Sequence, residues 1–352
     1  MKTYYTGLDI LRFIAALGVV NFHYFFGLAP IGLTSELTLF RYGNLGVPLF
    51  FIISGFVISQ SVANNSTKNF ALGRFIRLYP MFWFACTFTY IFTLIMPNGQ
   101  PVQFPEYLIS MTMLGDKLST ALGYGGLVDA VYWTLAVELL FYVYIGLFVY
   151  LFSWKNIRYF LWGWLILSAT SYLFHLDQNF GMKMLLVRHA SFFIMGGALA
   201  LYLENGFKLT REKFGDLLLV VLSVAYTIYI SPRAIPAYFV PNSLDTTIVA
   251  YSNIILVLLV LFFIYISKYL KNPRTRVICA VIGGLTYPIY LLHQTVGRTA
   301  ITYITEKFDY SWTSIGIVIE VIMLILAYGA YKYDKQLRVW LKAKLQTKEE
   351  TS

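Results

Sequence analysis

The sequence is poor in charge and in cysteine. Only 12% of its 352 residues are Asp, Glu, Lys or Arg, about half of the ~25% that is usual in soluble proteins. So few charges cannot cover a water-exposed surface of this size, which excludes a soluble protein. The two cysteines, Cys86 and Cys279, both lie inside apolar runs. This placement excludes a disulfide framework and a thiolate zinc site, and we expect both residues to be small buried hydrophobic groups.

Apolar residues are abundant instead. Hydrophobic residues make up 58% of the chain and aromatic residues 18%. Largely apolar runs of 18 or more residues recur, such as 8–28 and 131–152, and each can cross the ~30 Å hydrocarbon core of a bilayer. We therefore predict an all-α, polytopic integral membrane protein. It would have one membrane domain over residues 1–335, a short basic cytoplasmic tail over 336–352, and no extra extracellular domain.

Hydropathy predicts about ten transmembrane helices, and the basic residues orient them. The expected spans are 8–28, 44–62, 76–97, 131–153, 158–175, 185–204, 216–231, 248–267, 277–297 and 312–333. With the N-terminus inside, the inner segments carry 19 Lys and Arg residues and the outer loops six. This asymmetry predicts that both termini are cytoplasmic. The net charge of +10 then reflects membrane topology, so we expect membrane lipid around the protein and no nucleic-acid partner.

The longest outer segment, 98–130, separates the third and fourth predicted spans. Its stretch 105–114 is compatible with an amphipathic helix at the outer interface and equally with an ordinary loop.

Two ionisable residues share the first span. Arg12 and His23 are eleven residues apart, which is about 1100° of helical rotation, so both project from one face about 16 Å apart along the axis. Ionisable groups inside a membrane are costly, and each is a functional candidate. The alternative is an arginine that reaches the interface and a histidine with a structural role.

Two further groups fall at a similar depth on other spans. Glu138 lies about 10 Å inside the fourth span, and His293 lies in the outer third of the ninth. His23, Glu138 and His293 are all able to move protons, which suggests one site. A hydrogen-bond network that merely packs helices is the alternative.

Arg74 and Arg77 flank the cytoplasmic entrance of the third span. Taken alone they mark topology, but together with Arg12 they are suited to binding a polyanion, because guanidinium groups pair with phosphate.

These residues occur in segments that resemble the acyltransferase-3 family of bacterial membrane-bound O-acyltransferases. The matching segments are Leu8–Arg12 followed by His23, Gly46–Phe56, Arg74–Pro80, Trp133–Glu138 and Tyr287–His293. Each segment is a weak signal, but five in this order within the hydropathy pattern are specific.

The resemblance implies transfer of an acyl group, usually acetyl, from cytoplasmic acyl-coenzyme A to a hydroxyl of a cell-surface or lipid-linked polysaccharide. The location implied is the cytoplasmic (inner) membrane. Acetyl-coenzyme A would be the donor substrate, no metal is expected, and glycan-assembly proteins are possible partners. Relatives that carry an extracellular hydrolase-like domain contrast with the short tail expected here.

In that reaction the arginines Arg74 and Arg77, with Arg12 as a further candidate, would hold the phosphates of coenzyme A. His23 would act as general base on the acceptor hydroxyl or carry the acyl group itself. Glu138 would orient an imidazole, and His293 is a further catalytic candidate. The division of roles between the two histidines stays open at this point.

A secondary transporter or flippase for a lipid-linked sugar is the rival hypothesis, driven by proton transfer through the same three residues. Transporters commonly contain repeats and paired broken helices. The sequence has no evident repeat, although Pro48, Pro80 and Pro288 are positions at which helices can break. A catalytically inactive membrane scaffold is the third class.

Overall fold

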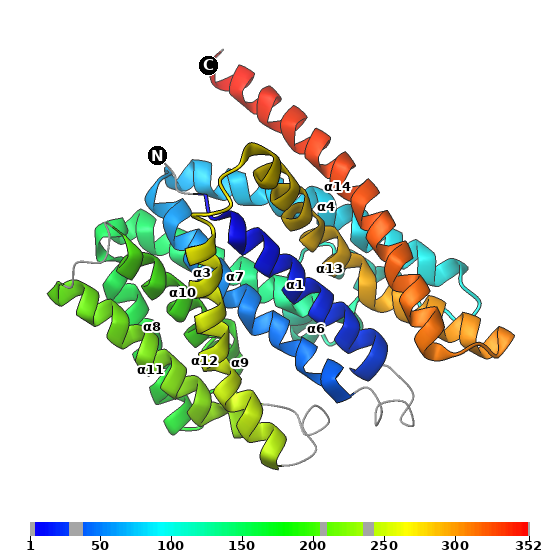
Figure 1. Cartoon of the computed structure of the whole chain (residues 1–352), viewed down its shortest axis with the longest axis horizontal. Coiled ribbons are helices and arrows are strands. Elements are labelled where there is room, and N and C mark those ends of the chain that lie inside the picture. The colour runs from blue at the N-terminus through cyan, green and yellow to red at the C-terminus, as the bar shows by residue number, and fades with distance from the viewer. Residues whose placement is uncertain (1–3, 28–37, 205–209, 235–242, 351–352) are drawn as a thin grey trace. The chain divides into compact units, whose positions relative to one another are not determined.

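The protein is built from helices. The computed structural model describes residues 4–27, 38–204, 210–234 and 243–350, and every regular element within these ranges is helical (Figure 1). The elements are α1 (Thr6–Phe22), η1 (His23–Gly27), η2 (Thr38–Leu45), α3 (Gly46–Ala63), α4 (Thr67–Ile95), α5 (Phe104–Ser110), α6 (Gly115–Leu122), η3 (Ala130–Tyr132), α7 (Trp133–Phe152), η4 (Trp154–Asn156), α8 (Ile157–Leu173), α9 (Phe180–Met184), α10 (Ala190–Leu203), α11 (Arg211–Ala234), α12 (Ser243–Ile266), α13 (Pro273–Phe308) and α14 (Trp312–Glu350). The expectation of an all-α protein is confirmed for the described part of the chain.

Several of these helices can cross a membrane. Seven described stretches are long and apolar enough: Thr6–Gly27, Leu39–Ala63, Thr67–Ile95, Ala130–Phe152, Arg211–Ile230, Pro273–Phe308 and Trp312–Lys344. Each of the ten predicted spans overlaps a helix, but α8 and α10 have only 17 and 14 residues, near or below the ~17–25 that a spanning helix needs. The protein is therefore a multi-pass membrane protein. The number ten and the cytoplasmic termini stay predictions.

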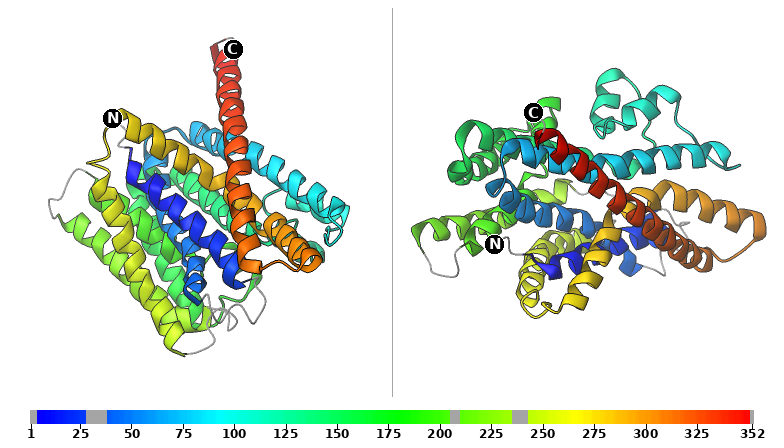
Figure 2. Two further views of the ribbon diagram at one scale, coloured as in Figure 1. Left: turned by 45° about the vertical axis from the view of Figure 1, so that its right-hand side comes forward. Right: turned by 90° about the horizontal axis from the view of Figure 1, so that it is seen from above.

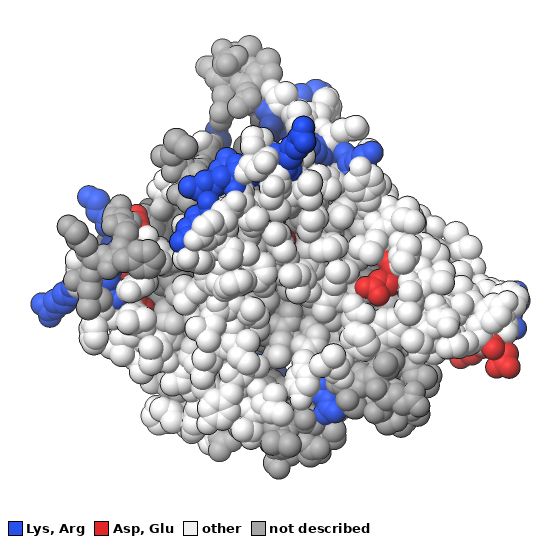
Figure 3. All heavy atoms as spheres, in the orientation of Figure 1, with Lys and Arg blue, Asp and Glu red and all other residues white. Residues whose placement is uncertain are grey.

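The outward-facing side chains of these helices are mostly apolar. Ile95, Phe262 and Ile325 are 75%, 55% and 65% exposed. Most side chains visible on the face in Figure 3 are likewise neither acidic nor basic. Such a surface is unfavourable in water and suits contact with lipid chains.

The chain forms two compact units. Unit 1 contains Met1–Ala15, Leu45–Phe70 and Val137–Val277, and unit 2 contains Ala16–Asn44, Ala71–Ala136 and Ile278–Ser352. In unit 2, α14 continues without a break to Glu350, so the predicted tail begins within this helix. The division into a membrane domain over 1–335 and a tail over 336–352 stays a prediction.

Unit 1 is packed closely around α3 and α10. A Cβ atom on Gly196 would lie 1.9 Å from the carbonyl oxygen of Ile52, and one on Gly55 would lie 2.2 Å from that of Phe193. Only glycine permits this approach, as is common between membrane helices. Stacked rings extend the contact, with centroids of Phe141 and Phe193 4.2 Å apart.

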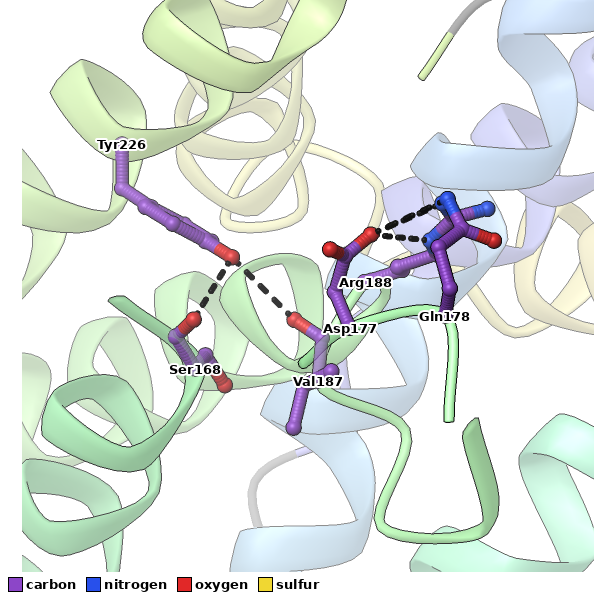
Figure 4. Close-up of polar contacts among 6 residues, drawn as sticks. All are labelled: Ser168, Asp177, Gln178, Val187, Arg188 and Tyr226. Atoms are coloured by element: carbon purple, nitrogen blue, oxygen red, sulfur yellow. Dashed lines mark hydrogen bonds and ion pairs between the residues drawn. The ribbon is translucent and has the colours of Figure 1, made fainter. Parts of the chain in front are cut away.

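Polar contacts tie the helices of unit 1 together near the ends of α8 and α10 (Figure 4). Arg188 donates from Nε and Nη2 to Asp177 Oδ2 at 3.0 and 2.8 Å. The hydroxyl of Tyr226 donates to the carbonyl oxygens of Ser168 and Val187 at 3.1 and 3.4 Å. Arg188, which lies inside a predicted span, is thus neutralised by an ion pair.

Unit 2 contains the segment between α4 and α7. The stretch 105–114 is mainly helical, because α5 spans Phe104–Ser110 and begins with a capping box between Gln103 and Glu106. Trp83 Nε1 donates to the Met111 carbonyl at 3.0 Å and docks the segment on α4. The left view of Figure 2 shows the C-terminal part of α14 extending past the other helices of this unit.

The prolines inside α4 and α13 do not end these helices. Pro80 and Pro288 both lie in continuous helices, and the hydroxyl of Tyr287 donates to the Leu78 carbonyl at 3.0 Å. This hydrogen bond joins α4 and α13 close to both prolines, whereas the carbonyls that lose their helical donors are those of Ile76 and Gly284.

Candidate active site

His23 lies where the first helix changes its geometry. α1 ends at Phe22, and the next five residues form the π-helical turn η1. Turns of this kind are rare and are frequent at functional sites. Trp312 supports the turn from outside, because its Nε1 donates to the carbonyl oxygen of Tyr24 at 2.7 Å. The π-helical turn and its hydrogen bond from Trp312 thus fix the backbone next to His23.

His293 lies in the interior of α13 and is fully buried. Its Nδ1 is 2.8 Å from the carbonyl oxygen of Tyr290. A carbonyl only accepts hydrogen bonds, so Nδ1 carries the proton and Nε2 keeps a free lone pair. The local backbone thus sets the tautomer of this imidazole.

The structure brings the two histidines together within unit 2. Their ring centroids are 5.2 Å apart. Within the described residues, Nδ1 of His23 and Nε2 of His293 are buried and have no hydrogen-bond partner. An unpaired buried polar atom costs about 1–3 kcal/mol, so two of them side by side require an explanation such as catalysis.

Tyr24 connects the π turn to the backbone of His293. Its hydroxyl donates to the His293 carbonyl at 2.8 Å. The approach is possible because Gly297 leaves room: a Cβ atom there would lie 1.9 Å from the Tyr24 hydroxyl. The glycine is thus required by the packing of the site.

Gly297→Ala is expected to lower the free energy of unfolding by about 1–3 kcal/mol, because the added methyl group displaces Tyr24 from a well-packed position. Gly163→Ala is the matched control: it lies in α8, and a Cβ atom added to it would have no other atom within 4 Å, while alanine favours a helix. The melting temperatures of the purified proteins check this. A Gly297→Ala protein as stable as its parent would contradict it.

Glu138 is held by hydroxyl groups within unit 1. Ser54 Oγ donates to its Oε1 at 2.7 Å, and the hydroxyl of Tyr142 donates to the same oxygen. The carboxylate is partly buried, and because both hydroxyl donors are neutral, neither of these contacts is an ion pair. The histidine pair, by contrast, belongs to unit 2.

The three arginines predicted to bind coenzyme A differ in their contacts and in their exposure. Arg12, in unit 1, forms an ion pair with Asp9 at 3.9 Å. Arg74 and Arg77 lie on α4 in unit 2, where Arg74 is half-buried and Arg77 is exposed. An exposed guanidinium can reach a phosphate group without a large desolvation cost.

Comparison with known proteins identifies the family. Residues 5–332 match the family described as Acyltransferase domain, a range that contains all six predicted site residues. The chain belongs to this acyltransferase family. A protein of Acidianus two-tailed virus, whose given name suggests an acetyltransferase, is 27% identical over 303 residues, covering 83% of each chain. No solved structure matches the chain.

The acyltransferase has a further buried acid that the sequence patterns did not single out. Asp129 is completely buried just before η3. Its Oδ1 accepts a hydrogen bond from Val131 N at 3.1 Å and its Oδ2 one from Thr295 N at 2.9 Å. In the sequence it stands four residues before the Trp133–Glu138 segment, and this position was the available signal.

Asp129 is expected to make the stability of the acyltransferase depend on pH. Its pKa is raised from 3.8 to about 6 because burial disfavours the charged form more than the hydrogen bonds from Thr295 and Val131 favour it. Between about pH 4 and 6 the folded protein keeps a proton that the unfolded chain releases. The contribution of Asp129 to the free energy of unfolding therefore falls as pH rises through this window and is constant above it.

Asp129→Asn should lack this contribution. The test compares melting temperatures of parent and variant from about pH 4 to 7; the neighbouring groups Tyr24, Cys86 and Tyr132 ordinarily titrate above about pH 8. If the melting temperatures of parent and variant changed with pH in the same way, the raised pKa of Asp129 would be contradicted.

Within the described ranges of the acyltransferase, no group of three or more His, Cys, Asp or Glu side chains is arranged to hold a metal ion. Cys86 and Cys279 are both buried, as predicted.

Proposed function

We propose that this acyltransferase transfers an acetyl group from cytoplasmic acetyl-coenzyme A to a hydroxyl of a cell-surface or lipid-linked polysaccharide, within the inner membrane. The observation that carries the proposal is the pair of imidazoles, each with a buried nitrogen that has no partner among the described residues. The family supports acyl transfer, and the name of the viral relative favours acetyl.

His23 acts as the general base. An imidazole nitrogen takes the proton of the acceptor hydroxyl, the oxygen forms a bond to the thioester carbonyl carbon, and the carbon–sulfur bond breaks. The leaving thiolate of coenzyme A then takes the proton from the imidazolium. The imidazole returns to its neutral form, and the reaction needs no further reactant. Transfer through an acyl-imidazole on His23 is the two-step form of the same chemistry. His293, next to His23, stabilises the charged ring or shares the proton.

Glu138 supplies negative charge for the imidazolium that forms during the reaction. Ser54 and Tyr142 hold the carboxylate by donating to one of its oxygens, which orients it without neutralising it. The acceptor polysaccharide is delivered by glycan-assembly proteins or diffuses as a lipid-linked precursor.

Arg74 and Arg77 bind the phosphates of the donor on the cytoplasmic side, with Arg12 as a further contact. Arg77→Ala is expected to weaken acetyl-coenzyme A binding about ten- to a hundredfold, because a charge-assisted contact contributes roughly 1.5–3 kcal/mol. Arg211→Ala is the control, since Arg211 is also an exposed basic residue on a predicted inner segment. Equilibrium binding of radiolabelled acetyl-coenzyme A to the purified proteins measures both. Equal affinity of folded Arg77→Ala and parent would overturn this role.

The function is tested with purified protein in lipid nanodiscs. Radiolabelled acetyl-coenzyme A is supplied together with polysaccharide extracted from cells that lack the protein. Label in the polysaccharide supports the proposal, whereas protein in sealed vesicles that moves a lipid-linked sugar without modifying it would indicate a transporter. Mass spectrometry of surface polysaccharide from cells with and without the protein then locates the ester and its acyl group.

A further inference from the structure

The turn of α13 that contains His293 has unusual backbone partners. The N–H of Thr295 and the carbonyl of Leu291, four residues earlier, are a donor–acceptor pair in helical geometry, and both also have partners outside α13. In the structure Thr295 N donates to Asp129 Oδ2 at 2.9 Å, and the hydroxyl of Tyr132 donates to the Leu291 carbonyl at 3.3 Å. The Thr295 N–H and the Leu291 carbonyl, which lie on either side of His293, thus both have partners on the short segment 129–132.

The same segment makes a third contact with this turn. Thr134 Oγ1 and the hydroxyl of Tyr290 are 2.8 Å apart, and Tyr290 is the residue whose carbonyl accepts from His293 Nδ1. Asp129, Tyr132, Thr134 and Tyr290 are all buried. Water therefore does not compete for these contacts, which strengthens them.

α13 also lacks one of its own backbone hydrogen bonds close to this turn. Pro288 lies inside α13, one turn before Leu291. Proline has no N–H, so the helical hydrogen bond to the carbonyl four residues earlier is missing. This turn of α13 lacks the backbone hydrogen bond that Pro288 cannot donate. Its next donor and acceptor, Thr295 N and the Leu291 carbonyl, bond to the segment 129–132. The backbone geometry of the turn is therefore set largely by that segment.

We propose that Asp129 and Tyr132 are positioning residues that set the geometry of the α13 turn and thereby the ring of His293. They hold the Tyr290 carbonyl in place to accept from Nδ1, so Nε2 stays unprotonated and the ring stays 5.2 Å from that of His23. The catalytic consequence rests on the proposed function, in which His293 takes part in acyl transfer.

The test uses two mild substitutions with two matched controls. Asp129→Asn keeps the shape of the side chain but leaves one oxygen where two accept now, and Tyr132→Phe removes only a hydroxyl. Asp116→Asn changes an acid of α6 that pairs with Lys117. Tyr107→Phe removes a hydroxyl that lies 2.9 Å from Thr87 Oγ1 on α4. Neither control residue touches α13 through these groups.

The first readout is steady-state transfer from acetyl-coenzyme A to extracted polysaccharide. Misplacing a reacting group by a fraction of an ångström to 1 Å costs up to about a hundredfold. We expect kcat to fall about ten- to a hundredfold in Asp129→Asn and Tyr132→Phe, with an unchanged KM for acetyl-coenzyme A. The two controls should keep both constants. A kcat at the parental value in both variants would overturn the inference.

The second readout does not depend on activity. In protein labelled with ¹⁵N-histidine, the ring signals of His293, assigned by their loss in His293→Gln, report which nitrogen is protonated. We expect the Nδ1–H form in the parent and both controls and a mixture of tautomers in Asp129→Asn. Parental ring signals in both variants would refute the positioning role. If the parent transfers no acetyl group, the proposed function fails, and the ring signals still decide the positioning of His293.

Discussion

His23→Ala is expected to reduce acyl transfer about 10²–10⁴-fold while leaving acetyl-coenzyme A binding intact. The reason is chemical: an acceptor hydroxyl is a poor nucleophile until a base removes its proton, and general-base catalysis typically contributes a factor of this size. The ring lies beside His293 in unit 2, and both imidazoles have a buried nitrogen without a partner among the described residues. Donor binding is assigned to other side chains, so only turnover should change.

The measurement pairs single-turnover transfer with equilibrium binding of acetyl-coenzyme A. His175→Asn is a suitable control, because His175 is exposed and has a φ of 55°, a conformation that asparagine tolerates. It should retain full activity. If folded, inserted His23→Ala transferred acetyl at the parental rate, His23 would be abandoned as the base and His293→Ala would be tested next.

Glu138→Gln should lose activity by a factor on the order of 10², the loss typical when one preorganised electrostatic contact to a developing charge is removed. Glutamine keeps the shape of the side chain, and its carbonyl oxygen still accepts from Ser54 and Tyr142. The variant should therefore fold and insert like the parent. What it lacks is the negative charge.

Two further variants separate charge from packing. Ser54→Ala and Tyr142→Phe each remove one of the donors to Oε1 while leaving the charge. If the charge is what matters, both should keep much more activity than Glu138→Gln when kcat is measured under identical conditions. Parental turnover by Glu138→Gln would show instead that this residue serves only to pack helices, which was the alternative left open by the sequence.

The class of protein and its family were determined by the sequence alone. A low fraction of charged residues and repeated long apolar runs are local properties, and the cost of exposing backbone groups to lipid makes helices the only spanning structure for such runs. The segments around His23, Arg74, Glu138 and His293 resembled the family whose match spans residues 5–332. Hydropathy alone did not determine the number of spans, because short helices such as α10, with 14 residues, are apolar without being long enough to cross a bilayer.

The arrangement of the site was decided only by the tertiary structure. Hydropathy placed His23 and His293 at a similar depth, but it says nothing about the rotation of one helix against another, which side-chain packing sets. Tyr24 and the carbonyl of His293 meet across 269 residues of sequence, and Asp129 and Thr295 across 166. The partners of the α13 turn and the contacts that Tyr24 and Trp312 make with the π turn at His23 are all of this long-range kind. They depend on packing between helices, which periodicity along one segment does not contain.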